Sequence, residues 1–356
     1  MHEVALLGCG RIAENHARIL GEGQVPGVRL AAVCDVVPGK AEVYAKRYGV
    51  PMFTDYREML ARPDIDVVAV LTPSGMHPEH SIAAARAGKH VVCEKPMALR
   101  LRDADRMIEE ADKAGVRLFV VKQNRYNAPV QALRRALEAG RFGRLILGTA
   151  RLRWMRDQSY YDADAWRGTW KYDGGALTNQ AVHHLDMLRW MMGDVVSVKA
   201  YATTALAKIE AEDTLVAVIR FASGALGAIE ATSACRPCDL EASLSVMGAT
   251  GEVVIGGTSV NKIVDWHFCE PRPGDDTVAA ETYSEPANVY GTGHLYYYQN
   301  VVDCLDRGLP ALVDGREARR TVELLCAIYE SVASGNEITL PFTPDKCPLG
   351  RGLPEV

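Results

Sequence analysis

The chain has 356 residues, of which 48% are hydrophobic and 24% charged, an ordinary composition for a globular protein of about two domains. Its formal net charge of −5 gives no reason to expect a nucleic-acid partner. No apolar run approaches the roughly 18 residues of a membrane span and no signal-peptide core follows Met1, so we expect no membrane partner.

Nine cysteines are scattered through apparent strands and helices, and their odd number favours reduced thiols. Reduced thiols are typical of the cytoplasm, which is the compartment that we predict. Cys235 and Cys238 have the C-x-x-C spacing of redox and zinc motifs, but no second pair follows and Pro237 favours a turn. We therefore predict a structural turn there.

The first predicted strand, Val4 to Leu7, runs into Gly8-Cys-Gly10-Arg-Ile-Ala13 and then into a predicted helix from Glu14 to Leu20. A G-x-G-x-x-G/A motif between a strand and a helix is typical of dinucleotide binding. The first glycine permits a tight turn, the second lets a pyrophosphate approach the backbone, and the helix N-terminus offers free N–H groups. We predict cofactor contacts at Gly8, Gly10, Arg11 and Ile12.

The next predicted strand, Leu30 to Cys34, ends in Asp35. An acid in this place accepts hydrogen bonds from the hydroxyls of the adenosine ribose. It comes slightly later than the usual offset of about 20 residues, because the loop Gly21 to Gly27 lengthens the connection. The carboxylate would repel a 2′-phosphate and no basic residue adjoins it, so we predict NAD rather than NADP as the cofactor.

Strand and helix patterns alternate through the rest of the first third of the chain and predict a six-stranded parallel sheet. The further predicted strands with definite bounds are Val67 to Leu71, Val91 to Cys93 and Leu118 to Val121, which with the two above make five of the six. The predicted helices are Lys40 to Tyr48, Tyr56 to Leu60, Ser81 to Ala87 and Leu101 to Lys113. We therefore predict an NAD-binding Rossmann domain over residues 1–125.

Glu94 and Lys95 follow the buried strand that ends at Cys93, and Pro96 stops any ladder beyond them. Ligands bind outside the carboxyl ends of the strands of an open parallel sheet. A functional lysine and a structural Glu-Lys pair that fixes the loop are equally good interpretations of these residues alone.

From residue 126 the pattern changes to runs of strands, which predict an α+β domain with a large, mostly antiparallel open sheet over residues 126–356. The predicted strands are Leu145 to Met155, Val196 to Ala205, Asp213 to Phe221, Ala225 to Ser233, Leu240 to Met247, Gly251 to Ile255 and Ile263 to Cys269. One helix from Val130 to Ala139 precedes them, and helices from Gly293 to Asp306 and from Arg316 to Ala333 close the chain.

The stretch from Asp173 to Asp186 reads as a glycine loop entering a helix that continues to Met192. On such a helix Asn179, His183 and Asp186 share one face. The more common interpretation is that His183 is a buried histidine held by an amide. The more specific interpretation is that His183 is a general base whose ring orientation is fixed. A metal site is excluded, because the adjacent His183 and His184 point apart on a helix.

These motifs together resemble the glucose–fructose oxidoreductase/inositol dehydrogenase/rhizopine-catabolism (Gfo/Idh/MocA) family. The resemblance rests on the glycine motif, Thr72-Pro73-x-x-x-His77, Gly88 to Pro96, the Gly174 to Asp186 segment and Asp314 to Ala318. It implies that Lys95 and His183 are catalytic. Most of the family has an aspartate where this chain has Asn179, and an amide cannot relay a proton, although it can orient the ring or bind substrate.

The family resemblance also implies cofactor contacts at both ends of NAD, with Trp166 and Arg167 at the nicotinamide end. The complete set that we predict for NAD is Gly8, Gly10, Arg11, Ile12, Asp35, Thr72, Pro73, Ser74, His77, Glu94, Lys95, Gln123, Trp166 and Arg167.

Within the family, the chain is most similar to a bacterial subgroup, the UDP-N-acetylglucosaminuronate 3-dehydrogenases. The subgroup motifs are Lys122 to Asn127, Arg141 to Arg144, Tyr160-Tyr161, Trp166 to Trp170 and Val289 to His294. They imply oxidation of the C3 hydroxyl of UDP-2-acetamido-2-deoxyglucuronate in surface polysaccharide (O-antigen) biosynthesis. The substrate contacts that we predict are Lys95, Asn124, Arg125, Tyr126, Arg156, Tyr160, Tyr161, Lys171, Asn179 and His183.

Two other functions stay open at this stage. One is a family dehydrogenase of a free polyol such as inositol, of a sugar phosphate or of another sugar, and the other is a non-catalytic NAD-binding regulator. Some relatives recycle NADH with 2-oxoglutarate, which the resemblance implies as a second small-molecule partner. We also predict a homo-oligomer, a dimer or tetramer, because the open sheet of the second domain needs a cover.

Overall fold

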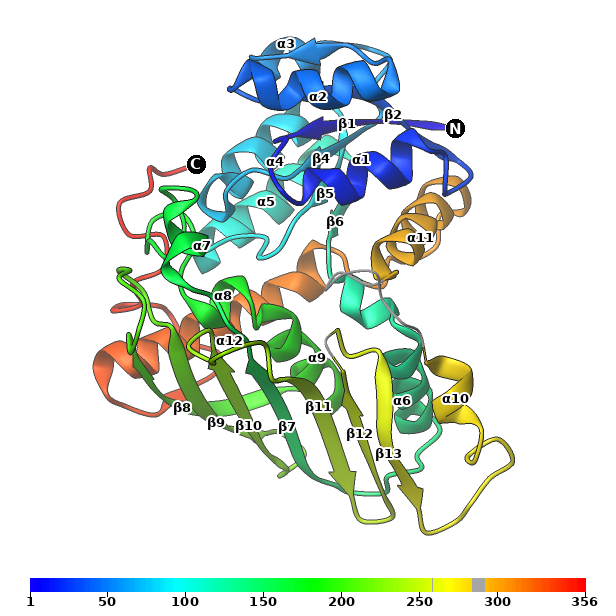
Figure 1. Ribbon diagram of the computed structural model, residues 1–356, viewed down its shortest axis with the longest axis vertical. Helices are drawn as coiled ribbons and strands as arrows, with labels where there is room; N and C mark the ends of the chain where they lie inside the picture. The colour runs from blue at the N-terminus through cyan, green and yellow to red at the C-terminus, as the bar shows by residue number, and fades with distance from the viewer. Residues whose placement is uncertain (258, 284–291) are drawn as a thin grey trace. The chain divides into compact units, whose positions relative to one another are not determined.

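The computed structural model describes residues 1–257, 259–283 and 292–356 (Figure 1). Contacts group these residues into two compact units. The first unit comprises Met1–Val121, His294–Val322 and Leu353–Val356, and the second comprises Lys122–Gly293 and Glu323–Gly352. The domain limits that the sequence predicts remain predictions. Residues 289–291 of the subgroup motif ending at His294 lie outside the described residues.

The first unit holds a six-stranded sheet whose paired strands all run parallel, in the order β3-β2-β1-β4-β5-β6. The strands are β1 (His2–Leu7), β2 (Val28–Cys34), β3 (Met52–Phe53), β4 (Val67–Val70), β5 (His90–Cys93) and β6 (Leu118–Val120). The order reverses between β1 and β4, and ligands of such sheets bind outside the carboxyl ends at that reversal. This confirms the predicted Rossmann sheet.

Five helices of the first unit connect these strands: α1 (Ala13–Gly21), α2 (Pro38–Tyr48), α3 (Tyr56–Leu60), α4 (His77–Arg86) and α5 (Leu101–Ala114). Helix α5 shows why the sequence forms them, since Leu101, Ala104, Met107 and Ala111 recur at helical spacing and are all buried. A buried apolar stripe of this kind is what fixes a helix to a sheet.

The end of the chain returns to the first sheet. The helices α11 (Gly293–Arg307) and α12 (Gly315–Ser334) lie in the sequence between the strands Lys262–Phe268 and Ile338–Thr339. Between them, Val313 accepts a backbone hydrogen bond from Val120 of β6 at 3.2 Å. His2 of β1 contacts Asp306 of α11, with Nε2 and Oδ1 2.8 Å apart. The first unit is therefore built from both ends of the chain.

The second unit holds an eight-stranded sheet in the order β13-β12-β11-β7-β10-β9-β8-β14. Its strands are β7 (Leu145–Arg153), β8 (Val195–Thr203), β9 (Thr214–Phe221), β10 (Leu226–Thr232), β11 (Glu241–Gly248), β12 (Gly251–Gly256), β13 (Lys262–Phe268) and β14 (Ile338–Thr339). All neighbours pair antiparallel except β7 and β10, which pair parallel. The predicted mostly antiparallel sheet is confirmed.

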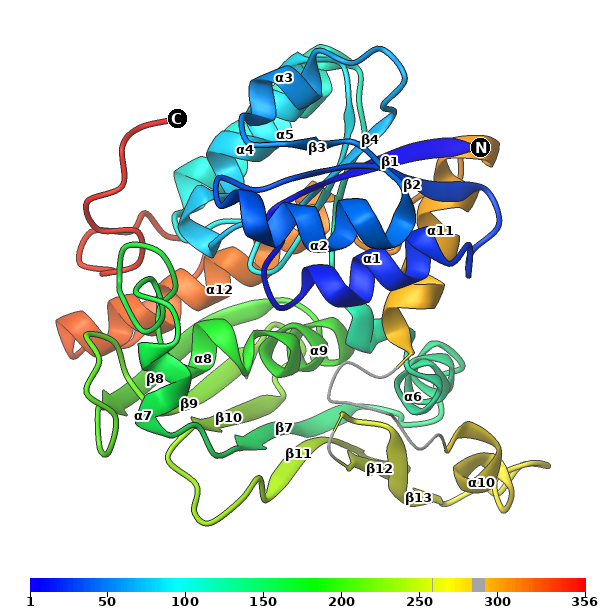
Figure 2. The same cartoon turned by 45° about the horizontal axis from the view of Figure 1, so that its top comes forward.

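Helices cover one face of this sheet and leave the other face accessible within the unit. The described helices that lie wholly within this unit are α6 (Ala128–Glu138), α7 (Gln158–Asp162), α8 (Ala176–Asn179), α9 (Val182–Met192) and α10 (Val278–Thr282). Helix α9 packs on β7, β10 and β11, and α8 packs on β9 and β10 (Figure 2). Along β9, Leu215 and Ile219 are buried, whereas Val216 and Val218 are 46% and 57% exposed.

Candidate active site

The glycine loop of the first unit fits a dinucleotide. Gly8 follows β1 with φ of +102°, and a Cβ atom there would lie 2.8 Å from the backbone carbonyl of Leu71. Only glycine tolerates both that backbone conformation and that approach. A Cβ atom at Gly10 would instead meet no heavy atom within 4 Å, so the space beside Gly10 is open for a ligand.

Asp35 ties this loop to the end of β2. Its Oδ2 accepts a hydrogen bond from the Cys9 N–H and its Oδ1 accepts one from the Val37 N–H, both at 2.8 Å. The carboxylate is half-buried, and the next two residues, Val36 and Val37, are exposed and apolar. The glycine loop and the acid therefore have the arrangement that a Rossmann domain uses for the pyrophosphate and the adenosine ribose.

His77 links the loop after β4 to the turn after β5. Its Nδ1 lies 2.7 Å from the carbonyl oxygen of Pro96 and its Nε2 lies 2.8 Å from that of Thr72. Burial lowers the pKa of His77, and its hydrogen bonds to the two carbonyls act in the opposite direction. His77 is 1% exposed, so its ring is a buried contact of the turn after β5. The predicted contact of His77 with the cofactor stays a prediction.

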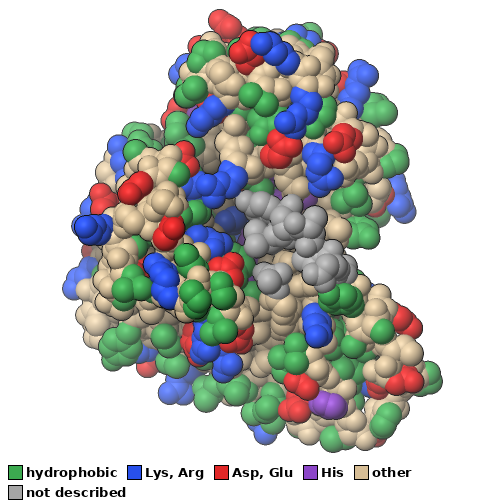
Figure 3. All heavy atoms as spheres, viewed as in Figure 1, with side chains coloured by type: hydrophobic (Ala, Val, Ile, Leu, Met, Phe, Trp, Pro, Cys, Tyr) green, Lys and Arg blue, Asp and Glu red, His purple; other side chains and the backbone are tan. Residues whose placement is uncertain are grey.

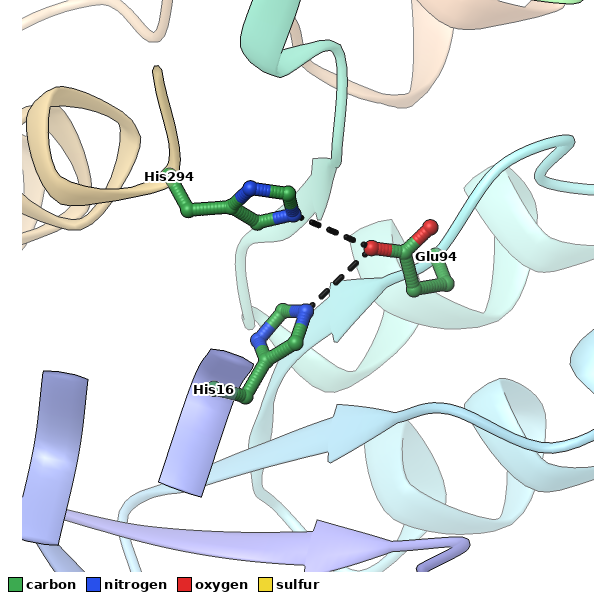
Figure 4. A group of neighbouring side chains, drawn as sticks. All are labelled: His16, Glu94 and His294. Carbon is green, nitrogen blue, oxygen red and sulfur yellow. Dashed lines mark hydrogen bonds and ion pairs between the residues drawn. The ribbon is translucent and has the colours of Figure 1, made fainter. Parts of the chain in front are cut away.

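Glu94 and Lys95 lie at the carboxyl end of β5, as the sequence predicts. Glu94 is buried and Lys95 is half-buried. The Oε2 atom of Glu94 accepts the backbone N–H of Lys95 at 2.9 Å. Its Oε1 atom lies 3.2 Å from His16 Nε2 and 3.5 Å from His294 Nε2 (Figure 4). Burial by itself raises the pKa of Glu94, but its hydrogen bonds to the two histidines hold that pKa well below its usual value.

In the second unit, the predicted continuous helix through Asn179, His183 and Asp186 is wrong. Helix α8 ends at Asn179, and α9 begins at Val182. At the break, the backbone N–H groups of both Gln180 and Ala181 bond to the carbonyl of Ala176, which interrupts the regular i to i−4 pattern. His183 and Asp186 share α9, whereas Asn179 lies before the break.

Asn179 is oriented by side chains that precede it in the chain. Its Nδ2 donates to Asp173 Oδ1 at 2.5 Å, and its Oδ1 accepts from the Tyr160 hydroxyl at 3.4 Å. Arg167 Nη1 donates to the same hydroxyl at 2.7 Å. Asp173 Oδ2 accepts the Gly168 N–H at 2.8 Å. Asp173 therefore fixes the side-chain amide of Asn179. In the sequence, the position of Asp173 directly before Gly174 and Gly175 is the signal that points to this role.

His183 is 7% exposed at the first turn of α9. The adjacent His184 has an edge-to-face contact with Trp154, with ring centroids 6.5 Å apart, and burial lowers its pKa to about 4. A neutral, enclosed ring at His184 leaves His183 as the better candidate for proton transfer.

One turn further on, Asp186 forms a buried ion pair with Arg125. Nε and Nη2 of Arg125 lie 2.6 and 2.9 Å from the two carboxylate oxygens, and the guanidinium lies 4.7 Å from the centroid of the Trp190 ring. Burial raises the pKa of Asp186, but the charges of Arg125 and Lys122 outweigh it and hold the pKa below its usual value. Arg125 is thus the counter-ion of Asp186.

Other predicted substrate contacts occupy different environments within the second unit. Asn124 is buried and Tyr126 is half-buried in the short 3-10 turn Gln123–Tyr126 after β6. Tyr161 is also buried, and its hydroxyl lies 2.7 Å from that of Ser233, so Tyr160 is the more accessible of the two tyrosines. Lys171 is half-buried, with Nζ 5.0 Å from the centre of the Tyr172 ring.

Arg156 lines a hollow of about 360 Å³ together with Tyr160 and the segment Pro237 to Asp239. Its guanidinium lies 4.9 Å from the Trp154 ring centre, and its Nη1 lies 3.3 Å from Asp239 Oδ1. Arg151 and Arg153 pair with Glu230 and Glu241 across neighbouring strands. Of the three arginines, Arg156 is the one that lines this hollow, and its side chain is also the least exposed of the three, at 17%.

Beneath α8, the buried Glu212 accepts the N–H of Leu177 at 2.9 Å and the hydroxyl of Tyr329 at 2.8 Å. Burial raises the pKa of Glu212 to about 7. A Cβ atom at Gly175 would lie 2.1 Å from the Glu212 carbonyl oxygen, which explains the glycine before α8. The sequence does not single out Glu212, because an acid preceding a strand reads as an ordinary surface residue.

Three comparisons with known proteins agree on the family. A model of an oxidoreductase family with an NAD-binding Rossmann fold matches residues 2–122, and a model of the family's C-terminal alpha/beta domain matches residues 134–340. The myo-inositol 2-dehydrogenase of Thermotoga maritima is 32% identical over 257 residues, which cover 70% of this chain and 74% of that enzyme.

Two solved structures are similar over nearly the whole chain. The WlbA dehydrogenase from Bordetella pertussis, in complex with NADH and UDP-GlcNAcA, is 44% identical with a TM-score of 0.89 and covers 96% of this chain and 98% of its own. The WlbA dehydrogenase from Chromobacterium violaceum, with the same two ligands, is 42% identical with a TM-score of 0.90 and covers 96% of each chain.

Within the described residues, no helix is both long and apolar enough to cross a bilayer. On the face drawn in Figure 3, acidic and basic side chains are interspersed over most of the surface. The glycine loop with Asp35, the matched family models and the similar sugar dehydrogenases lead to one conclusion. The chain is an NAD-dependent enzyme of the Gfo/Idh/MocA oxidoreductase family.

Proposed function

We propose that this enzyme oxidises the C3 hydroxyl of UDP-2-acetamido-2-deoxyglucuronate (UDP-GlcNAcA) to the 3-keto sugar. The observation that carries the proposal is the similarity, at 44% and 42% identity and over 96% of the chain, to two WlbA dehydrogenases crystallised with this nucleotide sugar. The inositol dehydrogenase relative, at 32% identity over 70% of the chain, favours a free polyol as the second candidate substrate.

In the proposed reaction His183 takes the proton of the C3 hydroxyl. A histidine titrates near pH ~6.5 when unperturbed and so suits proton transfer near neutrality. When bound, NAD would supply the hydride acceptor of the reaction, C4 of its nicotinamide. Asn179 would hydrogen-bond the sugar or the ring of His183, and its amide is already oriented by Asp173 and Tyr160.

Lys95 would donate a hydrogen bond to the same oxygen and stabilise the negative charge that develops on it. Its location after β5 supports this role, because ligands of a Rossmann sheet bind outside the carboxyl ends of the strands. Both Lys95 and His183 are present, which argues against the alternative of a non-catalytic regulator.

A UDP-hexuronate carries one carboxylate and one diphosphate, and both need cationic or hydrogen-bonding partners. Arg156 and Lys171 are the candidates for these anions, with Tyr160 and Tyr126 against the sugar or the uracil. The half-buried Arg156 beside its hollow supports the assignment of a ligand-binding arginine. Trp166 and Arg167 remain the proposed contacts of the nicotinamide end.

We also propose a metabolic role, a compartment and an oligomeric state for the enzyme. The 3-keto product would undergo amination in surface polysaccharide synthesis, and 2-oxoglutarate would reoxidise the bound NADH. In the part of the chain that the structure describes, none of the nine cysteines forms a disulfide, which supports the cytoplasm as the compartment. We further propose a homo-oligomer, dimer or tetramer, that covers the exposed face of the second sheet. Its exposed Val216, Val218 and Leu226 support that idea, and a monomer at micromolar concentration in sedimentation would contradict it.

The test is a substrate panel with NAD and 2-oxoglutarate, followed by mass spectrometry of the products. UDP-GlcNAcA should lose two mass units, and UDP-N-acetylglucosamine should react far more slowly, because an arginine built for the missing carboxylate would stay unpaired. Equal turnover of the two sugars, or turnover of myo-inositol alone, would overturn the substrate assignment.

A further inference from the structure

Three buried side chains from distant parts of the sequence meet in the first unit at one carboxylate oxygen. His16 lies in α1, Glu94 follows β5, and His294 lies in the first turn of α11 (Figure 4). Their side chains are 0%, 7% and 1% exposed. The enclosed carboxylate of Glu94 needs hydrogen-bond donors, because an uncompensated buried charge strongly destabilises the folded protein.

Each ring nitrogen of His16 has one polar partner. Its Nε2 lies 3.2 Å from Glu94 Oε1, and its Nδ1 lies 2.7 Å from the hydroxyl of Tyr298. A neutral ring satisfies both contacts if Nε2–H donates to the carboxylate and Nδ1 accepts from the tyrosine. Tyr298 thereby selects the tautomer that donates to Glu94.

His294 approaches the same oxygen from the other side, with Nε2 3.5 Å from Glu94 Oε1. The rings of His16 and His294 meet edge to face, with centroids 5.1 Å apart. The second oxygen of Glu94 accepts the backbone N–H of Lys95 at 2.9 Å. Glu94 therefore connects the two histidines directly to the backbone of Lys95.

We propose that His16 and His294 are positioning residues that act on Lys95 through Glu94. The histidines keep Glu94 ionised and fixed, and the carboxylate in turn holds the Lys95 backbone and favours the charged form of the lysine. The inference rests on the proposed function in one respect, namely that Lys95 hydrogen-bonds the reacting oxygen of the substrate.

The same three residues are also the ligand types of a two-histidine, one-carboxylate metal site, with donor atoms within 4.8 Å of one another. Metal binding needs the bare lone pair of each Nε2 atom. A hydrogen-bonded carboxylate needs the opposite, an N–H at each position. The two arrangements are mutually exclusive, so metal content is a direct test.

The experiment compares the wild-type enzyme with His16→Leu, His16→Gln and Glu94→Gln. A glutamine at position 16 retains an N–H donor of similar reach, and leucine retains only the bulk. Asp103→Asn is the matched control, since Asp103 is a buried carboxylate of the same unit that pairs with Arg100 at 2.5 Å. Folding of each variant is checked by thermal unfolding.

Two readouts are measured for each variant. The first is kcat and the KM for NAD with UDP-GlcNAcA. The second is the titration of Lys95 by NMR after reductive ¹³C-methylation, with Lys95→Gln assigning its signal. The NMR titration needs no substrate, so it decides the positioning role even if the proposed sugar is wrong, whereas absent wild-type turnover would count only against the proposed function.

We expect Glu94→Gln to lower the pKa of Lys95, because removal of a neighbouring anion disfavours the ammonium form. We expect His16→Leu to lower kcat by about tenfold or more with KM for NAD nearly unchanged, since small displacements of a catalytic group cost rate. His16→Gln should restore most of the loss, and Asp103→Asn should alter neither readout.

Three results would overturn the proposal. The first is an unchanged Lys95 titration in Glu94→Gln. The second is equal kcat for His16→Leu and His16→Gln. The third is one equivalent of zinc or another divalent metal in the purified enzyme whose removal by a chelator disrupts the cluster, because the Nε2 atoms would then be ligands rather than donors.

Discussion

The guanidinium of Arg125 donates two hydrogen bonds, of 2.6 and 2.9 Å, to the carboxylate of Asp186, and both side chains are 1% exposed. The pair joins the turn after β6 to helix α9, which carries His183. A fully buried pair of this kind constrains geometry more than it adds stability.

We therefore predict that Asp186→Asn destabilises the protein by about 3–5 kcal/mol, because it leaves the buried Arg125 without its counter-charge. Chemical denaturation of the wild type and the variant measures this loss. The double variant Arg125→Met with Asp186→Leu should recover much of it. A loss below about 1 kcal/mol in the single variant would show that the pair is dispensable.

Glu212 should make stability depend on pH in the direction opposite to most carboxyl groups. Its pKa is about 7 in the folded protein, above its ordinary 4.5, so the folded state binds the proton more tightly than the unfolded state. The stabilisation of the folded state by protonated Glu212 is therefore fully present below pH 4.5 and is lost as the pH rises towards 7.

Relative to Glu212→Gln, which does not titrate, the wild type should lose up to about 3 kcal/mol between pH 4.5 and pH 7. Urea unfolding of both proteins across this range measures the difference. A difference that stays constant with pH, or that grows in favour of the wild type, would contradict the raised pKa.

The two glycines of the cofactor loop should respond differently to alanine. Gly8→Ala meets the Leu71 carbonyl at 2.8 Å and a positive φ, so we expect a lower unfolding temperature. Gly10→Ala meets nothing within 4 Å, so the fold should be retained while the affinity for NAD falls by about tenfold or more, because the added methyl group occupies the space of the pyrophosphate. Calorimetry and NAD titration separate the two effects.

Lys95 and His183 should affect chemistry rather than folding. Replacing either by alanine should lower kcat by about 100-fold or more while NAD binding stays nearly intact. Steady-state kinetics and cofactor titration by tryptophan fluorescence measure both quantities. Near-normal turnover of His183→Ala would assign the base to another group.

The sequence predicts most of the first unit because its signals are local. Buried strands such as Val67 to Leu71 are continuous apolar runs, and the glycine motif stands where a strand meets a helix. The bounds of strand β3 escape prediction because its two residues, Met52 and Phe53, are too few to show any periodicity. The short β14 escapes prediction for the same reason.

The site is harder to predict, because its partners are distant in sequence. The helix break after Asn179 arises where Ala176 accepts two backbone amides, and no proline or glycine marks it. His16 and His294 are separated by most of the chain, and each alone reads as a core histidine. Only the fold brings both to Glu94.

We propose that the enzyme oxidises the sugar at C3 and transfers that hydride to NAD. The decisive substrate is UDP-GlcNAcA carrying deuterium at C3, incubated with the enzyme and NAD without 2-oxoglutarate. Mass spectrometry should find the deuterium in the reduced cofactor and a 3-keto sugar that has lost it. Deuterium retained in the sugar while NADH forms would contradict the claim, because another carbon would then be the site of oxidation.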